Sequence, residues 1–117
     1  MRDEILAKHP TARLRVFVVW FDMLTGDSRA LIDLRVLGDP RATNFWDGQK
    51  AVGRWFAANV PESRGLEVQP ITWDAYLLYG ADARWGSGAP GPLISLGRTV
   101  SGTHDRLRSS IVPLLRP

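Results

Sequence analysis

The sequence of 117 residues contains no cysteine. In thiol–disulfide exchange the attacking species is a thiolate, so a chain without sulfhydryl groups cannot carry out that reaction. The absence says little about the cellular compartment, because a small secreted domain can manage without disulfides and a cytosolic one usually does. The chain is therefore expected to act without thiol chemistry.

Long hydrophobic runs are also missing. The longest, residues 16–21 and 75–79, are far shorter than the roughly 18 residues that indicate a membrane span. The first four residues, Met-Arg-Asp-Glu, are not followed by the apolar stretch of a signal peptide. We expect a soluble, cytoplasmic protein without a membrane partner, unless a leader peptide was removed.

Lysine is scarce, since two lysines stand beside 13 arginines in a chain of net charge +3. The positive charge lies at the ends: residues 1–15 sum to +2, residues 98–117 to +3, and the middle to −2. At neither end do aromatic residues alternate with the arginines as they do in single-strand binders. Nucleic acid is therefore not expected as a partner, and the arginines are interpreted as solvated surface charges.

The length suits one domain with a single core. The 44% hydrophobic and 23% charged residues are values typical of a globular chain. We interpret residues 1–13 as an N-terminal extension and residues 14–117 as the domain.

The first half of the domain predicts two strands, each followed by a helix. Residues 16–21 are β-branched and aromatic throughout, which is typical of a central strand buried on both faces. Residues 25–28 predict a turn with a helix N-cap, and apolar residues at helical spacing follow until residues 38–40, Gly-Asp-Pro, stop the helix. Residues 42–46 predict a short strand, with a helical turn as the alternative.

A second helix is predicted from its cap at Asp47 to the block at Pro61. Val52, Trp55 and Phe56 share one face of it, which we expect to be its core face. Residues 61–70 predict a polar loop.

The second half predicts a strand over residues 71–79, an irregular glycine-rich loop over 80–91 and an antiparallel return strand over 93–96. Thr103 is the predicted N-cap of a last helix, which Pro113 should bend or end early. The element order is therefore strand, helix, strand, helix, strand, strand, helix. It predicts an α/β fold with a mixed four-stranded sheet flanked by helices.

Particular residues resemble the thioredoxin-like family. Residues 16–22, Val-Phe-Val-Val-Trp-Phe-Asp, are similar to the strand that leads into the thioredoxin reactive turn, and Leu24 and Asp27 then stand where its two cysteines would be. Pro70 precedes a strand as the cis-proline of that fold does. Residues 98–103 resemble the turn into the terminal helix. The match covers about residues 14–115 and implies a thioredoxin-like fold that lacks the Cys-x-x-C motif.

A narrower resemblance is to a group of uncharacterised bacterial thioredoxin-like domains. It implies a fold and no activity. The residues that carry it are Val18-Val19-Trp20, Asp39-Pro40-Arg41, Phe45-Trp46-Asp47, Trp73-Asp74, Ala83-Arg84-Trp85 and Gly91-Pro92.

Thioredoxins hold extended peptides beside the reactive turn, so the resemblance implies a peptide or protein partner. Backbone pairing beside a cis-proline needs no thiol. We therefore predict a redox-inactive binding module without a cofactor. Its predicted partner-binding residues are Leu24, Thr25, Gly26, Asp27, Trp46, Pro70 and Trp85.

A cysteine-independent enzyme or metal-binding domain is the first alternative. Asp22, Asp27 and Asp47 should gather at one edge of the predicted sheet, where carboxylates can hold a hard cation or act as a general base. Asp27 and Asp47 are each also explained as helix N-caps, which is the commoner role. No catalytic residue is assigned.

The five tryptophans give the second alternative, a self-associating structural module. Trp20, Trp55 and Trp73 fall on predicted core faces. Trp85 lies in the glycine-rich loop, where it either folds back over the core, which we favour, or serves as an anchor for a partner. In this alternative, two copies of the chain form a homodimer that buries the loop around Trp85.

Overall fold

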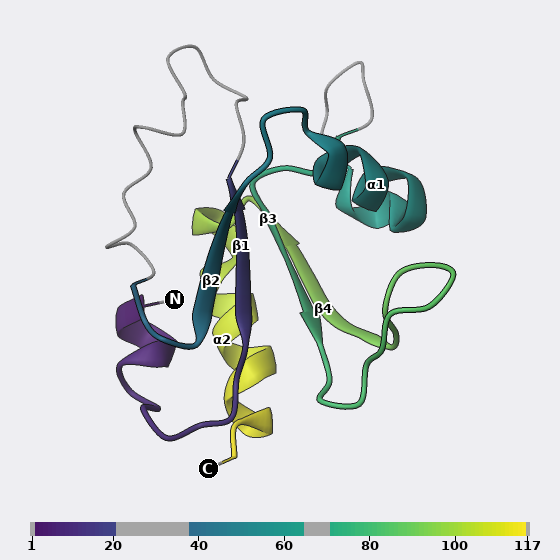
Figure 1. Ribbon diagram of the computed structural model, residues 1–117. Coiled ribbons are helices and arrows are strands. Elements are labelled where there is room, and N and C mark those ends of the chain that lie inside the picture. The colour runs from purple at the N-terminus through teal and green to yellow at the C-terminus, as the bar shows by residue number, and fades with distance from the viewer. Residues whose placement is uncertain (1, 21–37, 65–70, 117) are drawn as a thin grey trace. The chain divides into compact units, whose positions relative to one another are not determined.

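The computed structural model describes residues 2–20, 38–64 and 71–116. The chain divides into two compact units. Unit 1 consists of residues 1–52 and 115–117, and unit 2 of residues 53–114. Figure 1 labels the strands and α-helices that the described residues form. They are β1 (Val16–Trp20), β2 (Ala42–Trp46), α1 (Ala51–Asn59), β3 (Ala75–Tyr79), β4 (Leu93–Arg98) and α2 (His104–Ile111).

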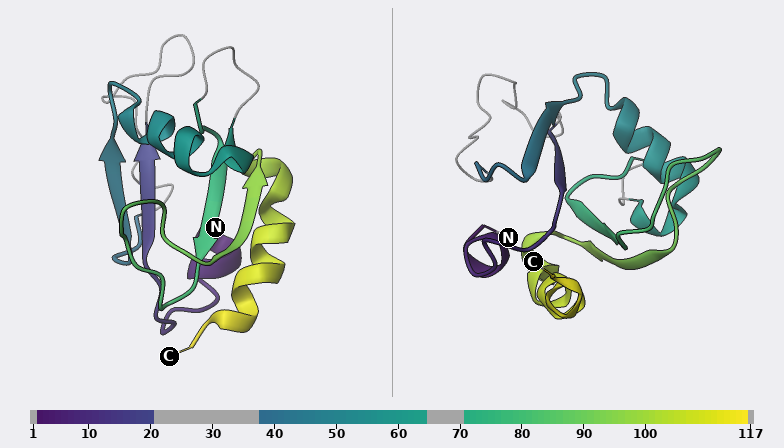
Figure 2. Two further views of the ribbon diagram at one scale, coloured as in Figure 1. Left: turned by 90° about the vertical axis from the view of Figure 1, so that its right-hand side faces the viewer. Right: turned by 60° about the horizontal axis from the view of Figure 1, so that its bottom comes forward.

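In unit 1, β1 and β2 form a parallel two-stranded sheet. Their register runs from Val16 opposite Ala42 to Trp20 opposite Trp46, and both arrows point the same way in Figure 2. The two faces of the sheet differ. On one face the indole N–H of Trp20 donates to the side-chain oxygen of Asn44 at 2.9 Å, whereas Phe17 and Phe45 on the other are exposed.

The N-terminal segment of unit 1 contains a short π-helix over Arg2–Leu6, in which Ile5 and Leu6 are buried. The chain then turns, with the N–H of His9 donating to the carbonyl of Ile5 at 3.0 Å. Arg41, which directly precedes β2, holds this turn through hydrogen bonds described below. The two residues with buried side chains make this segment part of the packed unit.

Helix α1 follows β2 after four intervening residues and ends before Pro61. Asp47 supplies its cap, because its carboxylate accepts the N–H groups of Ala51 at 2.9 Å and Val52 at 2.8 Å. A 3₁₀ turn over Pro61–Ser63 follows. The predicted cap at Asp47, the helix end before proline and the strand over residues 42–46 are confirmed.

In unit 2, β3 and β4 form an antiparallel hairpin, as predicted. The hydroxyl groups of Tyr76 and Ser95 lie 2.8 Å apart across it. Helix α2 lies along β4, and Arg106 donates to the carbonyl of Leu96 at 3.1 Å. A Cβ at Gly97 would collide with the side chains of Tyr76 and Thr103, so this close approach requires glycine.

A buried polar pair fixes the end of α1 to the residues before β3. The hydroxyls of Ser63 and Thr72, both buried, are hydrogen-bonded to each other. The hydroxyl of Ser63 also donates to the carbonyl of Val60 at 2.7 Å. The backbone N–H of Thr72 donates to the carbonyl of Gly53 at 2.9 Å. The pair therefore has partners for its polar groups, as buried hydroxyls require.

The predicted four-stranded sheet of the thioredoxin arrangement is wrong. The described strands form two separate sheets of two strands each, β1 with β2 and β3 with β4. The run of apolar residues in β1 predicted a central strand buried on both faces, but Phe17 is 64% exposed. A strand with one exposed face does not need the second covering layer that the prediction assumed.

Three local predictions are also corrected. The strand predicted over residues 71–79 begins only at Ala75, because Asp74 has a φ of 48° and breaks the extended backbone. Thr103 makes no cap with its hydroxyl, which donates back to the carbonyl of Thr99. In α1 the interior face is formed by small side chains, with Gly53 and Ala57 buried and Trp55 exposed.

Candidate functional site

Most of the predicted partner site falls outside the residues that the structure describes. Leu24, Thr25, Gly26, Asp27 and Pro70 all lie there, and so does the carboxylate candidate Asp22. Their proximity to one another therefore stays a prediction. Of the predicted site, the structure describes Trp46, Asp47 and Trp85.

Asp47 acts as a helix cap in the structure. Both of its carboxylate oxygens accept backbone N–H groups of the first turn of α1, which leaves less of their acceptor capacity for a cation. Among the described residues, no group of three or more His, Cys, Asp or Glu side chains is placed to hold a metal ion. The geometry at Asp47 supports capping over the metal-site alternative.

Trp46 and Trp85 lie in different units, Trp46 at the end of β2 and Trp85 in the loop between β3 and β4. Trp46 is half-buried, whereas Trp85 is 67% exposed. The favoured interpretation, that Trp85 folds back over the core, agrees with the structure only in part, because the ring lies near Trp55 and Phe56 while two-thirds of the side chain stays exposed.

Trp85 belongs to an aromatic cluster in unit 2 that also contains Trp55 and Phe56 of α1. The ring centroid of Trp85 lies 5.5 Å from that of Trp55 and 6.1 Å from that of Phe56. Trp55 and Phe56 meet edge to face at 5.0 Å. Tilted rings at these separations attract one another beyond the effect of buried area, by about 0.5–1.5 kcal/mol a pair.

Local hydrogen bonds shape the loop that carries Trp85. The N–H of Ala83 donates to the carbonyl of Gly80 at 3.1 Å and closes a turn. Arg84 donates from its guanidinium to the carbonyls of Ala81 at 3.0 Å and Ala83 at 2.8 Å. These contacts fix the backbone directly before Trp85, so the indole is presented by a braced turn.

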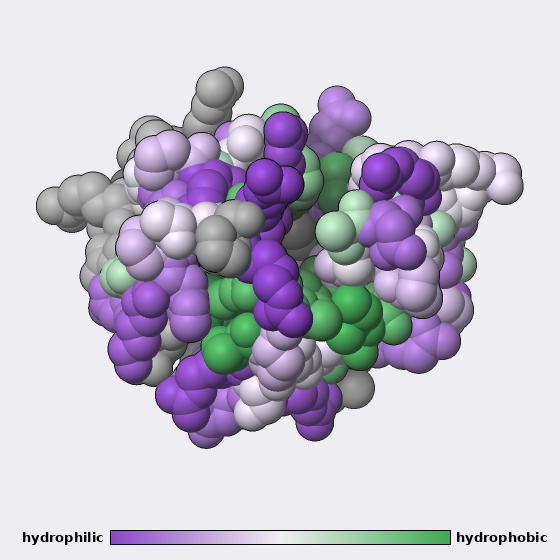
Figure 3. Space-filling view, turned by 90° about the horizontal axis from the view of Figure 1, so that it is seen from below, coloured by the Kyte–Doolittle hydropathy of each residue, from purple (hydrophilic) through white to green (hydrophobic). Residues whose placement is uncertain are grey.

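A second exposed aromatic pair lies in unit 1, on the outward face of the β1–β2 sheet. Phe17 is 64% and Phe45 49% exposed, and their rings stack with centroids 6.5 Å apart. More generally, hydrophobic residues reach the molecular surface between hydrophilic ones in the view of Figure 3. A pair of exposed rings of this kind is a candidate interaction surface.

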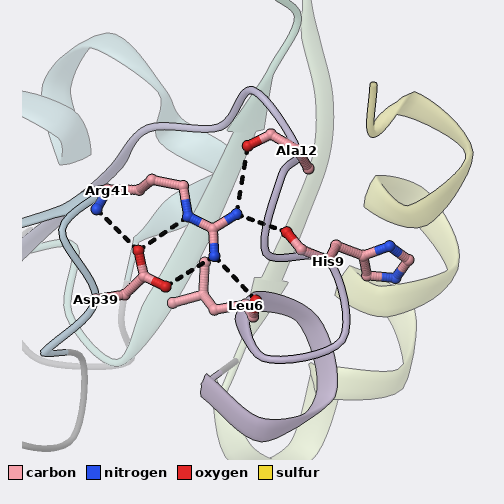
Figure 4. A network of polar contacts seen from close by, with 5 residues as sticks. All are labelled: Leu6, His9, Ala12, Asp39 and Arg41. Atoms are coloured by element: carbon pink, nitrogen blue, oxygen red, sulfur yellow. Dashed lines mark hydrogen bonds and ion pairs between the residues drawn. The ribbon is translucent and has the colours of Figure 1, made fainter. Parts of the chain in front are cut away.

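The strongest electrostatic feature is an Arg41–Asp39 pair in unit 1, shown in Figure 4. The guanidinium meets both carboxylate oxygens, at 2.9 and 2.7 Å, and also donates to the carbonyls of Leu6, His9 and Ala12. Hydrogen bonds from the Arg41 side chain and backbone lower the pKa of Asp39 from 3.8 to about 2. With its donors occupied internally, Arg41 has a structural role.

A shallow pocket of about 170 Å³ in unit 1 lies between residues 8–12 and the chain end at 115–116. Sites for small ligands usually measure about 300–1,000 Å³. The pocket between residues 8–12 and 115–116 lies below that range.

Comparison with known proteins yields no relative: no family model, no curated protein and no solved structure matches the chain. The resemblance to uncharacterised bacterial thioredoxin-like domains therefore stays a prediction. No helix in the described residues is long and apolar enough to span a membrane.

Sequence reasoning missed Phe17, Phe45, Trp55 and Phe56 as surface candidates. For α1 a signal was present, because Gly53, Ala57 and Val60 recur at helical spacing and form the buried stripe. Small residues at such positions let another segment approach closely, as the backbone of Thr72 does at Gly53. The larger rings next to that stripe are then left at the surface.

Proposed function

We propose that the chain is a non-catalytic module that binds a partner protein through the aromatic cluster of unit 2, with an extended peptide segment of the partner lying against Trp85. The observation that carries the proposal is the two-thirds exposure of an indole that two other rings already hold in position. Tryptophan is the residue type most enriched among side chains that dominate binding energies. An indole held before binding loses little side-chain entropy when a partner arrives.

The residues around the cluster support a protein partner that offers both apolar and charged groups. Arg54 and Arg84 each directly precede a tryptophan of the cluster, and both are exposed. An apolar centre with a charged rim is the usual composition of a protein interface. Aromatic surfaces of this kind receive extended segments, polyproline-type segments among them, since such segments lose little entropy on docking.

The rival functions have less support. A thiol oxidoreductase is excluded for a chain without cysteine. The carboxylate enzyme or metal site would need Asp47, whose oxygens cap α1. Burial of the Trp85 loop against a second copy of the chain remains as the competing use of the same surface.

The test is selection of peptides from a displayed random library on the full chain, followed by titration of the selected peptides. We expect the Trp85→Ala variant to bind them at least tenfold more weakly than the wild type, because truncation of a central anchor costs about 2 kcal/mol or more. Trp85→Phe should retain part of the affinity. Leu114→Ala is the matched control, since Leu114 is an exposed apolar residue elsewhere in unit 2.

Two outcomes would overturn the proposal. One is that the library yields no peptide whose affinity depends on Trp85. The other is that light scattering finds a stable dimer of the wild type that Trp85→Ala converts to a monomer, because the surface would then serve self-association. Circular dichroism should give superimposable spectra for the variants, since Trp85 lies in a loop.

A further inference from the structure

The outward face of the β1–β2 sheet in unit 1 carries two bare phenyl rings. Phe17 of β1 and Phe45 of β2 are about one-half to two-thirds exposed. Their rings are inclined by only 28°, with centroids 6.5 Å apart. Parallel strands normally have both faces covered. Two large rings exposed on such a face are therefore available to a ligand.

Two arginines continue this face toward the N-terminus. Exposure alternates along the chain from Arg13 to Phe17, with Leu14 and Val16 partly buried and the residues between them exposed. In extended backbone, residues two apart point to the same side. The exposed members of this alternating row are Arg13 and Arg15, which precede the start of β1, and Phe17 within it.

The guanidinium groups of Arg13 and Arg15 have no hydrogen bond or ion pair with any residue that the structure describes, in contrast to the fully engaged Arg41. The backbone N–H of Arg13 donates to the carbonyl of Arg116 at 2.6 Å, which brings the C-terminal residues beside the start of this row. The carboxylate that follows Phe45 on this side, Asp47, is engaged with α1. The face therefore combines available positive charge with exposed rings.

From this combination we propose that the outward face of the β1–β2 sheet binds single-stranded nucleic acid, with bases stacked on Phe17 and Phe45 and phosphates paired with Arg13 and Arg15. Single-strand-binding proteins pair a positively charged track for the backbone with aromatic rings for the bases. Sheets that display aromatic residues on an open face read single-stranded RNA in the same way. The face lies in unit 1, whereas the Trp85 surface proposed for a peptide lies in unit 2.

The choice of a single strand follows from the chemistry of the rings. A duplex keeps its bases stacked on one another, so it can use the arginines but not the phenyl faces. An acidic peptide would likewise pair with Arg13 and Arg15 and leave Phe17 and Phe45 bare. The sequence did not predict a nucleic-acid partner because aromatic residues do not alternate with the N-terminal arginines. In the fold, the pairing of β1 with β2 adds Phe45 to the face that carries Phe17.

The test is fluorescence anisotropy of a labelled oligo(dT) of about 12 nucleotides, a length within the site sizes of small single-strand-binding folds. The full chain should bind it, and Phe17→Ala and Phe45→Ala should each weaken binding by about fivefold or more, the range of base–aromatic stacking. The slope of log affinity against log salt should stay unchanged in these two variants. Arg15→Ala should instead reduce that slope by about one phosphate contact.

Matched controls separate the proposal from general charge attraction. Leu114→Ala removes an exposed apolar side chain and Arg108→Ala an exposed arginine of α2 in unit 2, and both variants should bind the oligonucleotide as the wild type does. Phe17→Trp should retain affinity because it keeps a stacking ring. Circular dichroism of each variant checks that the fold is intact, and Phe45→Ala provides a second ring variant if Phe17→Ala unfolds.

The proposal fails if the chain does not bind the oligonucleotide at low salt. It also fails if a duplex of the same length or a poly-glutamate peptide binds as tightly as oligo(dT). Equal affinity for these probes would mean that only the charge of the face is recognised, and that the rings play no part. Loss of peptide binding in Trp85→Ala with retained oligonucleotide binding would keep the two surfaces distinct.

Discussion

At the scale of single residues, Arg41 organises more of the chain than any other described side chain. Its guanidinium joins Asp39, which stands two residues before it, to three carbonyl oxygens of the N-terminal segment. Arginine suits this task because its planar group presents five N–H donors in fixed directions. A lysine in its place would supply three donors from one atom and would not reach both sides.

The Asp39–Arg41 pair gives a prediction about acid stability. Because the pKa of Asp39 falls from 3.8 to about 2 on folding, the ionised carboxylate favours the folded state. This contribution is fully present above pH 3.8 and is lost as the pH falls through about 2. Urea unfolding at a series of pH values should therefore give the wild type a higher free energy of unfolding than Asp39→Asn at pH 5. This difference in free energy should close as the pH falls toward 2.

If the difference in free energy of unfolding between wild type and Asp39→Asn stayed constant over that pH range, the charge of the carboxylate would contribute nothing to stability. Only the shape of the side chain would then matter. Asp105→Asn is the control, because Asp105 is paired with Arg108 on an exposed helix surface. Exposed pairs of this kind contribute little to stability. The free energy of unfolding of Asp105→Asn should therefore follow that of the wild type closely at each pH.

At the scale of elements, α1 depends on a cap from outside its own first turn. Asp47 lies in the link after β2 and accepts the N–H groups of Ala51 and Val52. We expect Asp47→Ala to lower the free energy of unfolding by about 0.5–2 kcal/mol and Asp47→Asn by less, since the amide keeps one acceptor. Chemical denaturation measures both. A wild type stabilised by added Mg²⁺ or Ca²⁺, in a way that Asp47→Asn abolishes, would contradict the capping role.

Sequence patterns identified most described elements because those patterns have local causes. The β-branched run at residues 16–20 and the cap at Asp47 act within a few residues of where they stand. Strand pairing has no such local cause. The same four strands suit one sheet or two, and sequence alone favoured one sheet, whereas the described ladders join β1 only to β2 and β3 only to β4.

The candidate surfaces were harder to predict than the elements. Helical periodicity assigned Trp55 to the core, on one face with Val52 and Phe56, but the small residues Gly53 and Ala57 occupy the interior face of α1. Phe17 and Phe45 come together only through the register of β1 and β2. Such contacts depend on long-range pairing, which periodicity within one segment does not contain.

At the scale of the whole molecule, each compact unit presents one exposed aromatic surface. Unit 1 carries Phe17 and Phe45, and unit 2 carries the Trp55, Phe56 and Trp85 cluster. These two surfaces are the observations on which the proposed binding functions rest.

The central claim, that the aromatic cluster of unit 2 binds a partner peptide, is tested most directly by NMR of the five indole N–H signals during titration with a library-selected peptide. The signals of Trp55 and Trp85 should shift with saturation. That of Trp20, whose indole N–H is bonded to Asn44, should stay in place and serve as the internal reference. Saturable binding that leaves the Trp55 and Trp85 signals unmoved would contradict the account.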